Sequence, residues 1–137
     1  MSELARIETV VFLQSADLFA ACKAEEVLRI SAIAHERRFQ AGEQIYNEND
    51  PAAALYCVAQ GEVRVHQAAG GGRTVGPLGT FGVVEILSGR LRTGKALAEK
   101  DTLVLEIDAE DFFDLLANNI EIVKALFRQL LRDDDSP

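Results

Sequence analysis

The chain has 137 residues, of which 48% are hydrophobic and 26% charged, and this composition excludes a disordered chain and fits a single globular core. Its 22 acidic residues outnumber the 14 basic ones, which gives a net charge of −8. Nucleic-acid binding by this chain alone is therefore not expected, because that contact needs clustered lysine and arginine side chains.

Residues 1–36 have the pattern of helices. A short apolar run extends from Ile7 to Leu13. A second run, 24–34, has apolar residues at spacings of three, three and one, which is the period of an amphipathic helix. We therefore expect helical segments before the rest of the fold.

Short strands and turns are expected over residues 37–107. Turn-forming residues follow Phe39 and Tyr46, and a tight turn is expected at Gly61. The expected strands include 55–58, 63–66, 74–75, 95–98 and 103–107. Short strands at this spacing predict a sandwich or a barrel.

Helical periodicity returns over residues 108–132, and an acidic tail, 133–137, follows. Asp108 is expected to cap the first of two helices. The second helix, 120–131, is expected to present one apolar face. Its members are Ile120, Val123, Phe127, Leu130 and Leu131, widened by Leu126. This face is too wide for one neighbour to cover, so we expect a homodimer through this helix.

An ordered series of short motifs runs through the middle of the chain. In order they are Phe39-x-x-Gly42-Glu43-x-Ile45, Asp50, Tyr56-x-Val58-x-x-Gly61-x-Val63-x-Val65, Leu78-Gly79-x-Phe81-Gly82 and Arg92-Thr93. Through their order and spacing the chain, from about residue 18 to 131, resembles the cyclic nucleotide-binding domain of catabolite activators, gated channels and kinase regulatory subunits. The resemblance implies one domain over 1–137 with a mainly β fold, a jelly-roll-like β-barrel with N-terminal helices and two C-terminal helices.

Residues 81–95 correspond in this resemblance to the phosphate-binding cassette, a short helix and loop between two barrel strands. In the family, amides at the helix start and one arginine neutralise the phosphate of the ligand, and a glutamate accepts a hydrogen bond from the ribose. By position, Gly82 matches the cassette glycine, Arg92 the phosphate arginine and Thr93 the small residue beside it. Val83 stands where the ribose-binding glutamate belongs.

The loss of that glutamate predicts weak binding. A missing hydrogen bond to a charged group costs roughly 1.5–3 kcal/mol, or about one to two decades of affinity. Glu85 lies about 200° around a helix from Val83, so it is not expected to replace the missing acceptor. Lys95 would add positive charge to the site if its strand points it inward.

The same residues also have structural interpretations that involve no ligand. Arg92 could belong with Arg90 and Lys95 to a solvated cluster. Val83 and Val84 fit core packing better than ligand contact. The sequence leaves these alternatives open.

No catalytic or metal chemistry is evident. The two histidines, His35 and His66, have no partner at ligand spacing, and surface or edge positions are expected for both. We therefore expect no enzyme, no metal and no cofactor, but a regulatory or protein-interaction module that binds cAMP and cGMP weakly or not at all. The alternative is an active receptor for a cyclic nucleotide or another phosphorylated small molecule. The output would lie on a partner protein, in the oligomer, or in a longer chain.

A cytoplasmic location is expected. No basic region precedes an apolar run at Met1 to Leu4, so a signal peptide is not expected, and no apolar stretch approaches the roughly 20 residues that span a bilayer. Cys22 and Cys57 have no close spacing and indicate a reducing compartment, although a single disulfide between them stays open.

Overall fold

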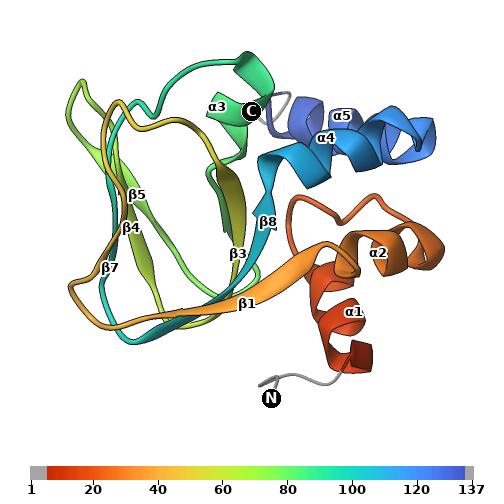
Figure 1. The fold of residues 1–137 in the computed structure, drawn as a ribbon, viewed down its shortest axis with the longest axis horizontal. Helices are drawn as coiled ribbons and strands as arrows, with labels where there is room; N and C mark the ends of the chain where they lie inside the picture. The colour runs from red at the N-terminus through yellow and green to blue at the C-terminus, as the bar shows by residue number, and fades with distance from the viewer. Residues whose placement is uncertain (1–5, 135–137) are drawn as a thin grey trace.

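The computed structural model describes residues 6–134, as Figure 1 shows. The helices are α1 (Arg6–Ser15), α2 (Ala24–Ser31), α3 (Val83–Ser88), α4 (Ala109–Ala117) and α5 (Ile120–Asp134). The strands are β1 (Ala34–Phe39), β2 (Gln44–Tyr46), β3 (Ala54–Gln60), β4 (Val63–His66), β5 (Gly72–Val75), β6 (Thr80–Phe81), β7 (Ala96–Ala98) and β8 (Thr102–Asp108). The signal-peptide expectation at residues 1–4 and the tail residues 135–137 lie outside the described part, and residues 133–134 end α5.

The strands form two antiparallel sheets. One sheet has the order β1-β8-β3-β6, and the other has the order β2-β7-β4-β5. The helices α1, α2, α4 and α5 lie on one side of the first sheet, and the second sheet lies on its other side (Figure 1). This arrangement confirms the predicted mainly β fold, a jelly-roll-like barrel with helices at both ends of the chain.

The central strands β3 and β8 are buried on both faces because they separate two cores. Along β3, Leu55 and Cys57 pack in the helical core, whereas Tyr56 and Val58 pack inside the barrel. Along β8, Leu105 and Ile107 face the helices and Val104 faces the barrel. Alternation of side chains with a period of two sends successive residues to opposite faces, so a continuous apolar run serves both cores.

The boundary between the N-terminal helices and the barrel differs from the expected one. β1 begins at Ala34, not at residue 37, and it pairs with β8 from Ala34↔Ile107 to Phe39↔Thr102. Helix α2 therefore ends at Ser31, and His35, within the range expected to be helical, lies on a strand, where it is exposed as expected. Pairing of six β1 residues with β8 stabilises a strand here more than the helical spacing of residues 33 and 34 would stabilise a longer α2.

Helix α5 is rotated relative to the expected apolar face. Its buried side chains are Ile122, Ala125 and Leu126, whereas Ile120, Phe127 and Leu131 are 63%, 58% and 60% exposed. The buried residues lie at positions i, i+3 and i+4, which share one helix face, and Ala125 allows close approach to the core. The apolar residues of α5 therefore do not share the single face that was expected. They form one buried face and one exposed face.

Candidate functional site

The cassette residues 81–95 lie between β6 and β7. Gly82 precedes α3 with a φ of 87°, and Gly89 ends the helix with a φ of 70°. A left-handed backbone at both ends is accessible to glycine without steric cost. These two glycines set a six-residue helix, and the chain then returns through residues 90–95 to the barrel.

Arg92 is the largest fully buried side chain described, with 2% of its surface exposed. Its Nη1 donates to the carbonyl oxygen of Gly82 at 2.7 Å and to Oε1 of Glu85 at 3.0 Å. Its Nη2 donates to the carbonyl oxygen of Ala54 on β3. The guanidinium also lies over the ring of Tyr46, 4.1 Å from the ring centroid. The interpretation of Arg92 as a solvated surface residue is therefore wrong.

Burial keeps Tyr46, the aromatic neighbour of Arg92, neutral. Burial raises the pKa of Tyr46 to about 12, although the Arg92 charge acts in the opposite direction. A neutral phenol ring presents its π face to the guanidinium, which is a favourable contact in a desolvated site. The Nε of Arg92 is buried without a hydrogen-bond partner.

Gly82 allows the guanidinium to approach the backbone. A Cβ atom there would lie 3.2 Å from both the Ala54 oxygen and Nη1 of Arg92. Any side chain at this position would press on the group that the arginine binds. The cassette glycine is therefore favoured both by its φ and by the space it leaves.

The carboxylate of Glu85 connects the two residues matched to phosphate binding. Thr93 donates through its hydroxyl to Oε2 of Glu85 at 2.9 Å, while Arg92 donates to Oε1. Burial raises the pKa of Glu85, but hydrogen bonds from Thr93, from the Glu85 backbone and from Arg92, together with the Arg92 charge, outweigh it and lower the pKa. Glu85 is therefore an ionised carboxylate at neutral pH.

Val83 does not share this polar cluster. Its side chain is buried and belongs to the helical core with Leu18 and Ile86. This confirms the packing interpretation of Val83. The same interpretation is wrong for Val84, which is 56% exposed, because successive residues of a helix lie about 100° apart.

The end of the cassette is held by backbone contacts. The carbonyl oxygen of Thr93 accepts from Ala68 at 2.8 Å, and a Cβ at Gly94 would lie within 2.0 Å of the His66 oxygen. Gly94 is thus required by this close crossing. Lys95 is exposed, so its charge is not directed inward beside Thr93.

Sequence reasoning missed the position of Glu85. The 200° rotation between Glu85 and Val83 excludes Glu85 from the ribose position. Once Val83 is assigned to the helical core, the same rotation directs Glu85 away from that core and toward Arg92. The signal was therefore present in the helix period and in the apolar character of Val83.

The described residues, 6–134, contain no metal cluster and no disulfide. No group of three His, Cys, Asp or Glu side chains in this range could hold a metal ion. Both Cys22 and Cys57 are buried free thiols, so the open possibility of a disulfide between them is not realised. Over the same residues, the helices are too short or too polar to cross a membrane.

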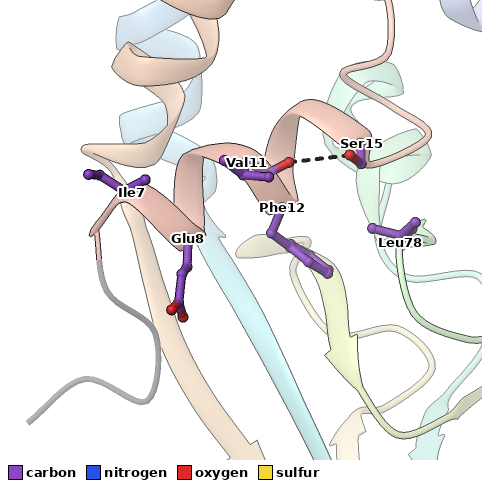
Figure 2. Close-up of a pocket in the computed structure, with 6 residues that line it drawn as sticks. All are labelled: Ile7, Glu8, Val11, Phe12, Ser15 and Leu78. Carbon is purple, nitrogen blue, oxygen red and sulfur yellow. Dashed lines mark hydrogen bonds between the residues drawn. The ribbon is translucent and has the colours of Figure 1, made fainter.

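A separate apolar hollow lies between α1 and the turn at Leu78. Figure 2 shows its lining, which includes Ile7, Val11 and Phe12, and its volume is about 450 Å³. Leu78 has a φ of 74°, an unusual backbone for a leucine, and its amide and carbonyl bond to Val58 and Asp17. This hollow contains no cassette residue.

Comparison with known proteins agrees with the geometry. A family model described as cyclic nucleotide-binding domain matches residues 36–119. The cyclic AMP receptor protein of Thermus thermophilus is 30% identical, over 90% of this chain and 61% of that protein. The chain thus spans less than two thirds of this relative.

Solved structures extend the comparison. The N-terminal domain of a transcriptional regulator from Streptomyces coelicolor matches with a TM-score of 0.75 and 27% identity, over 89% of this chain and 91% of that chain. The catabolite activator protein of Thermus thermophilus matches with a TM-score of 0.71 and 31% identity, over 86% of this chain and 58% of that chain.

Proposed function

Because this chain belongs to the cyclic nucleotide-binding domain family, we propose that it is a regulatory or protein-interaction module without catalytic activity, whose pocket binds cAMP and cGMP weakly or not at all. The observation that carries the proposal is the carboxylate of Glu85, which accepts hydrogen bonds from both Arg92 and Thr93. The two groups matched to phosphate binding already have an anion as their partner.

The cost of admitting a phosphate supports the proposal. A phosphate that replaced Glu85 would have to break the ion pair between Arg92 and Glu85, in which the arginine side chain is 1% exposed and the glutamate side chain 14%. If Glu85 stayed nearby, two negative charges about 4 Å apart would repel by roughly 4 kcal/mol at an effective dielectric of about 20.

The residue at the ribose-binding position adds a second free-energy cost to nucleotide binding. Val83 has no acceptor and packs in the helical core, so a ribose hydroxyl loses a hydrogen bond to a charged group. This loss is worth roughly 1.5–3 kcal/mol. Together the two penalties exceed the difference between micromolar and millimolar affinity, which is about 4 kcal/mol.

Titration calorimetry with cAMP and with cGMP tests the proposal. We expect no binding at micromolar concentrations. Micromolar or tighter binding of either nucleotide would contradict the proposal and support the alternative, an active receptor for a cyclic nucleotide or another phosphorylated metabolite. A thermal-shift screen of phosphorylated metabolites extends the test, since a bound ligand stabilises the fold by about 2.7 kcal/mol at a hundredfold excess over its dissociation constant.

We further propose that the module forms a homodimer through α5. Its exposed side chains Ile120, Phe127 and Leu131 lie at spacings of seven and four, which place them along one helix face. Such a face is stabilised when a twofold mate covers it. The output would be passed to a partner protein or to another part of a longer chain, in the cytoplasm, where the two free thiols stay reduced.

Light scattering across a concentration series tests the dimer. We expect twice the chain mass of 15.0 kDa, and we expect Phe127→Asp to reduce it to the monomer mass. Gln14→Asp, at an exposed position on α1, is the matched control and should leave the dimer intact. A mass of 15.0 kDa at every concentration, or a dimer that survives Phe127→Asp, would contradict this interface.

A further inference from the structure

We infer that Glu85 is a specificity-determining residue, a tethered carboxylate that fills the anion position of the cassette and excludes phosphate-bearing ligands. The inference rests on the proposed function, since it explains why a cassette that keeps its arginine would bind cyclic nucleotides weakly. It also makes a claim of its own, that the anion site is latent and not lost.

The geometry of the donors supports a latent site. Arg92 directs Nη1 and Thr93 directs its hydroxyl to different oxygens of the same carboxylate, at 3.0 and 2.9 Å. Two donors converging on two oxygens of one anion is also the arrangement that a phosphate group accepts. The donors are therefore preorganised, and the anion that they bind comes from the chain itself.

The position of Arg92 does not depend on Glu85 alone. The guanidinium also donates to the carbonyl oxygens of Ala54 and Gly82 and lies over the ring of Tyr46. Without the Glu85 carboxylate these three contacts remain, and they would hold the guanidinium in place. The guanidinium would then lack an anionic partner at the position that the Glu85 carboxylate now occupies.

The tether gives Glu85 an advantage over a free ligand. Glu85 lies on α3, whose two ends are set by Gly82 and Gly89, so its carboxylate stays near the donors. An intramolecular group competes at an effective concentration of the order of millimolar or more, which a dilute metabolite does not reach. The excluded class is therefore anionic ligands that need both Arg92 and Thr93.

Glu85→Ala and Glu85→Gln test the inference. Each variant is titrated with cAMP, with cGMP and with inorganic phosphate, and its melting temperature is measured with and without phosphate. We expect Glu85→Ala to bind at least one of these anions at least tenfold more tightly than the unmodified chain does. Phosphate should raise its melting temperature and leave that of the unmodified chain unchanged.

Two further variants separate a specific site from a change in overall charge. Glu99→Ala removes an exposed glutamate outside the cassette and should not increase anion binding. The double variant Glu85→Ala with Thr93→Val should lose most of the affinity gained, because one of the two donors is removed. If Glu99→Ala gains as much affinity as Glu85→Ala, the inference is overturned.

The outcomes distinguish this inference from the proposed function. If the unmodified chain does not bind and the folded Glu85 variants also do not bind, the tethered-anion inference is wrong and the proposed function stands. If the unmodified chain binds cyclic nucleotide at micromolar concentration, the proposed function fails. A further tenfold gain in Glu85→Ala would then still support the role of Glu85, and equal affinity would overturn it.

Whether the Glu85 variants fold also tests the inference. Glu85→Gln keeps the shape of the side chain and an oxygen acceptor, so it decides the test if Glu85→Ala does not fold. If neither variant folds even in excess phosphate, Glu85 is a structural residue and the inference is overturned.

Discussion

The two ends of the cassette differ in what their side chains contact. At the start, Val83 packs into the helical core, and nothing on its side chain can hydrogen-bond to a ligand. At the end, Arg92 and Thr93 keep their donors, and Glu85 accepts from both. One end presents an apolar side chain to the helical core, whereas the other keeps two donors and pairs them with a carboxylate of the chain itself. Under the proposed function, the two ends disfavour a nucleotide in two different ways.

The largest effect is expected from removing the inward-facing arginine. Arg92→Ala leaves the buried carbonyl oxygens of Ala54 and Gly82 and the Glu85 carboxylate without their donor. We expect a loss of about 3–5 kcal/mol in the free energy of unfolding, measured by urea denaturation. Arg90→Ala, at an exposed position of the same loop, is the control and should cost less than about 0.5 kcal/mol. Equal effects would show that Arg92 does not brace the fold.

The second prediction tests the apolar end. Val83→Glu puts a polar group into the helical core and should destabilise the chain by roughly 1–3 kcal/mol, whereas the neighbouring Val84→Glu, on the exposed side of α3, should change stability little. With Glu85 still in place, Val83→Glu should not create cyclic nucleotide binding. Calorimetry checks this, and micromolar binding by this single variant would mean that only the ribose contact was missing.

A smaller effect separates backbone strain from crowding in the cassette. Gly82→Ala and Gly89→Ala both place an alanine at a positive φ, which costs about 1–2 kcal/mol. Only at Gly82 would the new Cβ also meet Arg92 and the Ala54 oxygen, because the space at Gly89 is open. We expect Gly82→Ala to lose more stability than Gly89→Ala in urea denaturation. Equal losses would indicate that the arginine moves aside without cost.

The smallest expected effect is on the free energy of unfolding at acidic pH. The pKa of Glu85 is lowered in the folded chain relative to its ordinary value of 4.5, so its ionised form contributes stability that is fully present above pH 4.5. This contribution is lost as pH falls through the folded pKa. The stability difference between the unmodified chain and Glu85→Gln should therefore be constant near neutrality and should shrink below pH 4.5. A difference that grows on acidification would contradict the assigned ion pair.

Much of the fold could be predicted from the sequence because the signals are local. Alternating apolar residues and turn residues around Gly61 identified the strands, and Asp108 was correctly expected to cap a helix, since its side chain accepts from the amides of Glu110 and Asp111. Asn49, with a φ of 70°, adopts the left-handed turn that asparagine tolerates.

The incorrect predictions concern which side of a helix faces the core, because tertiary packing and not local sequence sets the rotation of a helix about its axis. The exposed and buried faces of α5 could not be separated from spacing, because Ile120, Ile122 and Leu126 are all apolar and the core selects among them. The contact of Glu85 with Arg92 joins residues seven apart across a helix end and a loop. No local pattern specifies such a pair, since it depends on how Val83 orients α3 against the core.

The bracing by Arg92 has a consequence for how such pockets change over evolutionary time. A guanidinium that ties β3, the Gly82 turn and α3 together, while lying on Tyr46 of β2, contributes to folding whether or not a nucleotide is ever present. Natural selection for a folded barrel would then preserve the arginine after selection for a ligand has ended. In descendants of a nucleotide sensor, the signature arginine would thus outlast the sensing. The residue facing it, here a glutamate, would be the better record of whether the sensor still works.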